Sequence, residues 1–211
     1  MLKLNLEEAR KLLFLGAHSD DIEIGCGGTI LTLAKTHPGL EIYWVVFSAG
    51  GKRGKEARLS ATQFLKGIRR TKVVAKEFRT SYFPSQGERI KTYFETLKSF
   101  NPDIIFTHCR DDRHQDHRIL SDLAWNTFRD HLILEYEIPK YDGDLGIPNL
   151  FVPLDAAVAR RKAESICQAF ATQKGKHWFS EDTFLALMRL RGVECASEYA
   201  EAFYSRKMVC G

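Results

Sequence analysis

Short apolar runs alternate along the chain with longer amphipathic stretches, and this alternation constrains the fold more than any other feature. The runs are rich in β-branched and aromatic residues, as in EIYWVVF at 41–47. Strands are predicted at 12–17, 41–47, 71–78, 103–107 and around 131–137. Helices are predicted at 29–35, 56–65, 88–100, 116–129, near 155–172 and near 181–191. Strands that alternate with helices form βαβ units, which predicts an α/β protein with a mainly parallel sheet.

The length and composition of the chain fit one domain. Its 211 residues are enough to form a full hydrophobic core, and 44% apolar with 27% charged residues is the balance of an ordinary globular protein. A Gly-rich loop is expected at 49–54 and a Gly/Pro-rich loop at 141–149. Neither has the length or composition of an interdomain linker. We therefore expect a single domain over residues 1–211.

Charge, hydropathy and cysteine content argue against several classes of protein. The net charge of +4 is small and spread along the chain, which gives little support for nucleic-acid binding but suits an anionic small molecule. No apolar run approaches the roughly 20 residues of a membrane span, and the N-terminus lacks the apolar core of a signal peptide. We expect a cytoplasmic protein without a transmembrane segment. The five cysteines contain no CxxC pair, so neither a disulfide framework nor a cysteine zinc site is indicated.

Polar side chains gather where two of the predicted strands end. The first strand runs directly into HSDD at 18–21. The fourth strand runs into His108, and HQDH follows at 114–117. In open α/β sheets, ligands bind beyond the carboxyl ends of the strands. Both clusters are therefore expected to open onto the same rim of the sheet, while ordinary loop hydrogen bonding accounts for His108 and for Asp111 nearby.

Within these clusters, His18, Asp21 and His117 offer nitrogen and oxygen donors that suit zinc. A catalytic zinc keeps three protein ligands and an open position for water, so these residues are the predicted ligand set. Each cluster alone is also explained by helix capping or loop solvation, and it is their combination that favours a metal. Iron, cobalt or nickel would accept the same donors, which leaves the native metal open.

Three further residues are candidates for the chemistry. Asp20 lies between two predicted ligands and is free to act as a base toward water, which zinc makes more acidic. His114 is placed to donate a proton or to stabilise an oxyanion in a tetrahedral intermediate. Asp116 is a candidate partner that holds one imidazole in its productive tautomer. An N-cap of the following helix is the alternative role for Asp116.

The glycines at 25, 27 and 28 invite a phosphate-loop interpretation. Their spacing is not GxGxxG, and the acidic and imidazole residues of the first cluster separate them from the end of the strand. This argues against a dinucleotide site. Close packing of the helix start under the predicted metal turn is the role that we expect for them.

The sequence AHSDDIEIGCGGTI at 17–30 resembles the signature of the LmbE-like, or PIG-L, family of N-acetylglucosaminyl deacetylases, which opens with AHPDD. The sequence DRHQDH at 112–117 resembles the D-x-H-x-D-H motif of that family, and 53–67 is similar to its stretch after the second strand. The resemblance spans at least 12–120. It implies a Rossmann-like three-layer αβα sandwich with a mainly parallel central sheet, and zinc-dependent removal of an N-acetyl group from an amino sugar.

Roles follow from the resemblance position by position. His18, Asp21 and His117 match the metal ligands of the family. Asp20, His114 and Asp116 match its general base, the imidazole that stabilises the intermediate and the paired carboxylate. Arg53 is similar to an arginine that faces the substrate in some members, and a solvated loop arginine is the alternative. Ser19 stands where the family has proline; serine reaches the same φ, so the turn is expected to survive.

The resemblance also implies a small amino-sugar conjugate as substrate and self-association, often as trimers or hexamers. The loops at 79–88 and 139–153 are expected to select the conjugate, and the second suits a substrate lid. Two alternatives stay open at this point. One is a zinc-binding homologue without turnover, and the other is a nucleotide-binding protein on the same general fold.

Overall fold

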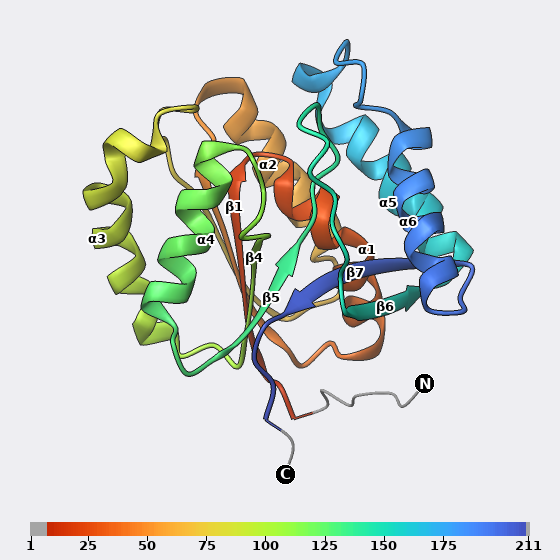
Figure 1. The fold of residues 1–211 in the computed structure, drawn as a ribbon, viewed down its shortest axis with the longest axis horizontal. Helices are drawn as coiled ribbons and strands as arrows, with labels where there is room; N and C mark the ends of the chain where they lie inside the picture. Colours follow the sequence, from red (N-terminus) through yellow and green to blue (C-terminus); the bar gives the residue numbers. More distant parts are fainter. Residues whose placement is uncertain (1–7, 210–211) are drawn as a thin grey trace.

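The computed structural model describes residues 8–209, which form a seven-stranded sheet between two layers of helices (Figure 1). The strands are β1 (Lys11–His18), β2 (Glu41–Ser48), β3 (Arg70–Ala75), β4 (Ile104–His108), β5 (Leu132–Tyr136), β6 (Leu150–Leu154) and β7 (Tyr199–Ser205). The helices are α1 (Asp21–Thr36), α2 (Gly51–Phe64), α3 (Gly87–Leu97), α4 (Gln115–Thr127), α5 (Ala156–Ala169) and α6 (Glu181–Glu194). This arrangement confirms the predicted α/β sandwich with a mainly parallel sheet.

The strand order of the sheet is β3-β2-β1-β4-β5-β7-β6. The strands from β3 to β5 are parallel, and β7 is antiparallel to both β5 and β6. From β1 the chain builds the sheet outward through β2 and β3, then returns to place β4 on the other side of β1. The strand order therefore reverses between β1 and β4, and ligands of open α/β sheets bind at such a switch point.

Two hydrophobic cores lie on the two faces of the sheet. Side chains of β1 alternate between them: Leu12 and Phe14 face α1 and α2, whereas Leu13 and Leu15 face α3 and α4. Helices α5 and α6 extend the first of these layers (Figure 1). Because both faces are covered, the central strands are apolar along almost their whole length, which is the pattern that made them recognisable in the sequence.

The structure differs from the sequence predictions at the starts of two helices and in two strands that were missed. Helix α1 begins at Asp21, not at Thr29, and α2 begins at Gly51 within the expected loop at 49–54. Strands β6 and β7 were not predicted. The expected loop at 49–54 contributes Gly51 and Gly54 to α2, and the glycines at 25, 27 and 28, expected at the helix start, lie inside α1.

The glycines of α1 are close-packing positions, as expected. A Cβ atom at Gly25 would lie 2.2 Å from the Tyr136 ring, and one at Gly28 would lie 2.5 Å from Leu154. The helix is also interrupted at Cys26, whose φ of −144° and ψ of 18° are not helical. None of the helices formed by residues 8–209 is long and apolar enough to cross a membrane.

Candidate metal centre and active site

The site begins where β1 gives way to α1. His18 is the last residue of β1, and Asp21 is the first of α1. The backbone N–H of His18 donates a hydrogen bond of 2.6 Å to Asp21 Oδ2, which closes the turn between them. Ser19, the departure from the family proline, lies in this closed turn. The turn therefore has the geometry needed to bring an imidazole and a carboxylate together.

The three predicted ligands converge through one atom each. His18 Nδ1 lies 3.1 Å from His117 Nε2 and 3.3 Å from Asp21 Oδ2, and His117 Nε2 lies 3.5 Å from Asp21 Oδ2. Two ligands of a tetrahedral zinc ion, each about 2.0–2.1 Å from the metal, lie about 3.3 Å apart. All three side chains are buried. The residues present therefore fit a small divalent transition metal.

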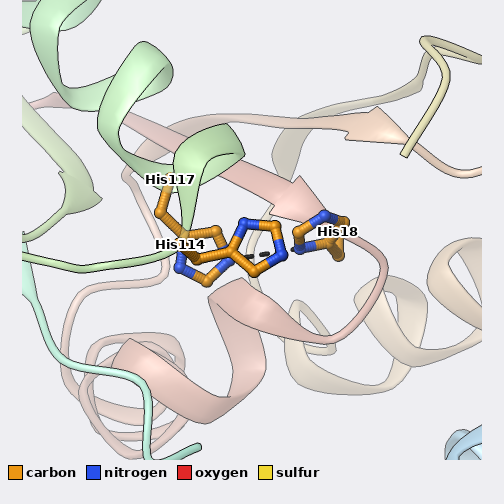
Figure 2. A group of neighbouring side chains, drawn as sticks. All are labelled: His18, His114 and His117. Carbon is orange, nitrogen blue, oxygen red and sulfur yellow. Dashed lines mark hydrogen bonds between the residues drawn. The ribbon is translucent and has the colours of Figure 1, made fainter. Parts of the chain in front are cut away.

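Two other combinations of donors come close enough to share an ion. One is His18, His114 and His117, whose rings lie next to one another in Figure 2. The other is Asp21, His108 and His117. His117 belongs to every set, which makes it the common ligand. The sets differ in which two of His18, Asp21, His108 and His114 complete the group.

Each proposed histidine ligand is held by a carboxylate through its other ring nitrogen. His117 Nδ1 lies 2.8 Å from Asp112 Oδ2, and His18 Nε2 lies 3.1 Å from Asp116 Oδ2. Such partners fix the tautomer and orientation of a metal-binding imidazole. Asp116 lies against His18, which is therefore the imidazole that it would hold.

Asp116 is in turn held by the loop that precedes α3. The backbone N–H of Ser81 donates a hydrogen bond of 2.6 Å to Asp116 Oδ2, and that of Phe83 donates one of 3.1 Å to Oδ1. Ser81 has a φ of 68°, a left-handed conformation that is uncommon outside glycine and is found at functional sites. The loop expected to select the substrate is thus hydrogen-bonded directly to Asp116, the carboxylate that contacts His18.

Asp20 is buried beside the ligands. Its Oδ1 lies 3.4 Å from Nη2 of Arg53, whose side chain is only partly exposed. Burial, followed by the negative charge of Asp21, raises the pKa of Asp20, and the Arg53 guanidinium opposes the shift. A raised pKa suits a carboxylate that has to accept and return a proton near neutral pH.

His114 is the N-cap residue of α4, and its ring orientation is set by that role. Its Nδ1 accepts a hydrogen bond of 3.2 Å from the backbone N–H of Asp116. Because Nδ1 is the acceptor, the neutral ring carries its proton on Nε2. Burial, followed by the charge of His18, lowers the pKa of His114, which favours the neutral form. The residue is therefore arranged as a hydrogen-bond donor through Nε2.

The pKa values of His18 and His117, the two proposed histidine ligands, are shifted in opposite directions. Burial lowers the pKa of His18, but Asp21 and the hydrogen bond to Asp116 outweigh it and raise the value to about 9. Burial and the neighbouring His108 lower the pKa of His117 to about 3, against the opposing effect of Asp21. A proton on His18 thus compensates the local negative charge, a role that a metal cation would take over.

The family model for PIG-L, described as GlcNAc-PI de-N-acetylase, matches residues 13–128, more than half of the chain. The chain belongs to the PIG-L family. The matched part contains the three predicted ligands and Asp20, together with both motifs from which the family resemblance was inferred.

Solved structures share the PIG-L fold with this chain. N,N'-diacetylchitobiose deacetylase from Pyrococcus horikoshii has a TM-score of 0.77 at 21% identity, over 94% of this chain and 84% of that one. The zinc-inhibited form of teicoplanin deacetylase Orf2 has a TM-score of 0.70 at 14% identity, over 92% and 97% of the two chains.

A third neighbour shows that the fold alone does not decide the reaction. GalB, the 4-carboxy-2-hydroxymuconate hydratase from Pseudomonas putida KT2440, has a TM-score of 0.75 at 15% identity, over 96% of this chain and 98% of that one. A hydratase and deacetylases thus share this architecture. The chemistry of this PIG-L member has to be argued from its own site.

Two residues of the site were missed in the sequence. His108, assigned to ordinary loop hydrogen bonding, is fully buried at the end of β4, with Nε2 3.2 Å from Asp21 Oδ2 and its ring stacked on His117 at 3.9 Å. Asp112 supports His117 but was given no role. Its place as the first residue of the PIG-L motif DRHQDH was the available signal.

The loop proposed as a substrate lid is anchored next to the PIG-L motif. Lys140 Nζ lies 3.0 Å from Asp112 Oδ2 and 2.5 Å from Asp144 Oδ2, and Asp144 accepts a hydrogen bond of 2.7 Å from the Arg113 N–H. Its tip is exposed, with 72% of the Tyr141 surface accessible. The loop thus has a fixed base at the site and an exposed tip.

Proposed function

We propose that this protein is a metal-dependent hydrolase that removes an N-acetyl group from an amino sugar or from a conjugate of N-acetylglucosamine. The observation that supports this most directly is the convergence of His18 Nδ1, Asp21 Oδ2 and His117 Nε2, with Asp20 beside them. Membership of the PIG-L family supports the same reaction. The deacetylases of diacetylchitobiose and teicoplanin among its structural neighbours are consistent with it.

The donor set supports zinc as the metal, and iron, cobalt or nickel as substitutes. When bound there, the metal would supply a Lewis acid that polarises the acyl carbonyl and makes water a better nucleophile near neutral pH. His18, Asp21 and His117 would hold it. A zinc-inhibited form of one structural neighbour is a reason to test more than one metal.

The remaining steps fall to side chains of the chain itself. Asp20 accepts a proton from the attacking water and returns it to the nitrogen of the leaving amine, so that the C–N bond breaks without a net change in protons on the enzyme. His114 donates its Nε2 hydrogen bond to the carbonyl oxygen as negative charge develops on it. Asp116 contributes by holding His18 in place.

Arg53 is the proposed substrate-binding residue. Its Nη2 reaches Asp20 while the side chain stays partly exposed, so the rest of the guanidinium remains available to a ligand. Together with the net charge of +4, this favours an anionic conjugate. We further propose that residues 1–211 act as one domain, in the cytoplasm, as a homo-oligomer.

The test is the release of free amine from a panel of neutral and phosphorylated N-acetylglucosamine conjugates. Wild type would be compared with Asp20→Asn and with metal-stripped protein to which zinc, cobalt, nickel or iron is restored. We expect both altered forms to be inactive and metal to rescue only the stripped one. Metal binding without release of amine from any conjugate would favour a catalytically silent homologue. Failure to bind any of these metals would refute the proposal.

A further inference from the structure

Helix α1 is broken five residues after the proposed ligand Asp21. The non-helical backbone at Cys26 separates a short first part, residues 21–25, from the longer remainder of the helix. A break of this kind leaves carbonyl groups on one side and N–H groups on the other without helical partners. The first part carries the ligand at its start, so its direction determines where the carboxylate points.

Glu201 of β7 satisfies the N–H groups after the break. Its Oε1 accepts a hydrogen bond of 2.7 Å from the Gly28 N–H. Its Oε2 accepts bonds of 2.7 Å from the N–H and 2.6 Å from the hydroxyl of Thr29. A carboxylate in this position acts as the cap of the second part of the helix, where the positive end of the helix dipole lies.

Lys162 of α5 satisfies the other side of the break. Its Nζ donates a hydrogen bond of 2.6 Å to the Ile24 carbonyl oxygen and another of 2.6 Å to Glu201 Oε1. Lys162 and Glu201 are each only 3% exposed. The two ends of the broken helix are thus joined through a single buried ion pair, which comes from elements far away in the sequence.

The first part of the helix is also fixed against the sheet. Gly25 packs against the Tyr136 ring so closely that no Cβ would fit, and the Tyr136 hydroxyl donates a hydrogen bond of 2.6 Å to the Leu15 carbonyl of β1. Rotation of residues 21–25 toward a continuous helix would have to disrupt both this packing and the bonds of the ion pair. The broken form of α1 is therefore fixed by these contacts.

We propose that Lys162 and Glu201 are positioning residues for the metal centre: their ion pair holds α1 in its broken form and so directs Asp21 toward His117. This inference rests on the proposed function, since it assigns the pair a role toward the same site. Both residues lie outside the part of the chain that the family model matches. The C-terminal third of the chain would thus contribute to the active site without touching it.

The decisive variant is Glu201→Gln, which keeps the shape of the side chain but turns an amide NH₂ toward donors that need an acceptor. Lys162→Met removes the other partner, and Lys162→Arg is the conservative variant. Phe94→Leu is the matched control, because Phe94 is fully buried in α3 on the opposite face of the sheet and its truncation lowers stability without reaching α1.

Two readouts separate positioning from stability. Zinc affinity, measured against a competing chelator, is expected to fall roughly tenfold or more in Glu201→Gln and Lys162→Met, as for residues that orient metal ligands. Hydrogen exchange of the metal-free protein is expected to speed up at residues 20–30 before it does so in the rest of the molecule. Lys162→Arg should retain most of the wild-type affinity, and Phe94→Leu all of it despite its lower melting temperature.

The outcomes distinguish this inference from the proposed function. If wild type binds no metal, the proposed function fails. If wild type binds metal and releases amine, but Glu201→Gln and Phe94→Leu lose zinc affinity only in proportion to their loss of stability, the pair is a structural ion pair and the inference is overturned. Unchanged exchange at residues 20–30 in Glu201→Gln would overturn it as well.

Discussion

Asp112 Oδ2 lies 2.8 Å from His117 Nδ1, on the side of the imidazole away from the proposed metal-binding nitrogen. The same carboxylate is 3.0 Å from Lys140 Nζ and accepts a hydrogen bond of 2.8 Å from the His114 N–H through Oδ1. Burial raises the pKa of Asp112, but the hydrogen bond from His117 and the charge of Lys140 more than offset this and hold it well below its usual range. Asp112 is thus ionised and in contact with His117, the proposed ligand that every donor set shares.

Replacement of this carboxylate is expected to weaken metal binding. Asp112→Asn removes the negative charge that makes His117 a stronger donor and that fixes its tautomer, and such changes cost about 10–100-fold in metal affinity. A chelator-competition titration with zinc measures the effect. Asp122→Asn is the control, because Asp122 lies on the exposed face of α4, the helix that carries His117, and should leave the affinity unchanged. Equal affinities for the two variants would contradict the role assigned to Asp112.

His114 distinguishes two of the three ligand sets that the geometry allows, the one completed by Asp21 and the one completed by His114 itself. If Asp21 completes the set and His114 stabilises the oxyanion, His114→Gln should keep nearly full zinc affinity while kcat falls about 10²–10³-fold, the typical cost of losing one such donor. A loss of metal affinity as large as that of His18→Gln would instead assign His114 as a ligand. Parallel zinc titrations and steady-state kinetics on the same preparations decide between them.

The central strands were predictable because their apolar character is visible without tertiary information. Burial on both faces makes β1 and β2 read as continuous apolar runs. Strand β6 was missed because LFVPL contains Pro153, which normally argues against a strand. Proline is tolerated there because β6 is the edge strand of the sheet. That position depends on pairing with β7, which no local pattern reveals.

The candidate site was predictable to the extent that it lies in motifs at strand ends. His18, Asp21 and His117 come together because parallel strands bring their carboxyl ends to one edge. Lys162 and Glu201 could not be found in this way. Both approach α1 from more than 130 positions along the chain, and a lysine in an amphipathic helix or a glutamate in a strand is ordinarily a surface residue.

The proposed lid was predicted at 139–153, but it ends at 149 because β6 begins at Leu150. Its exposed tip is expected to act on the substrate but not on the metal. Replacing residues 141–143 by a shorter link should lower kcat/KM for N-acetylglucosamine conjugates while zinc affinity is retained, because Lys140 and Asp144 at the base keep their contacts. Kinetics on neutral and phosphorylated conjugates, with a zinc titration beside them, measure the split. Unchanged kcat/KM after trimming would remove the lid hypothesis.

Glu23 is expected to make the protein less stable as the pH rises. Its side chain is fully buried in α1, and neither carboxyl oxygen has a hydrogen-bond partner among the described residues. Burial raises its pKa well above the usual range, and the nearby Ser60 hydroxyl opposes this only in part. When the pKa of a carboxyl group is higher in the folded state than in the unfolded state, the group contributes stability below its unfolded-state pKa, about 4.3 for glutamate. This contribution is lost as the pH rises through the folded-state pKa.

Glu23→Gln removes that pH dependence while keeping the shape of the side chain. The variant should match or fall below wild type near pH 4 and gain stability relative to it at higher pH. Urea unfolding of the metal-free proteins from pH 4 to 9 measures the difference. A constant difference across this range would show that Glu23 has the same pKa in the folded and unfolded states, and would refute the raised value. Glu88→Gln, in the exposed first turn of α3, is the control for a general effect of lost charge.

Removal of the metal is expected to lower the melting temperature, because a ligand that binds only the folded state stabilises it in proportion to the logarithm of its concentration. Zinc at 100 times its dissociation constant contributes about 2.7 kcal/mol. For a chain of 150–250 residues, each kcal/mol shifts the melting temperature by about 2–4 °C, so the expected shift is roughly 5–10 °C.

Asp21→Asn should abolish the shift, because its amide is a poor substitute for the carboxylate that completes the ligand set. Asp21 interacts favourably with the neighbouring histidines, which hold its pKa low, so Asp21→Asn is also expected to change the stability of the protein without zinc. The comparison therefore uses the shift in melting temperature that zinc causes within each protein. A zinc-dependent shift of wild-type size in Asp21→Asn would transfer the ligand role to His114.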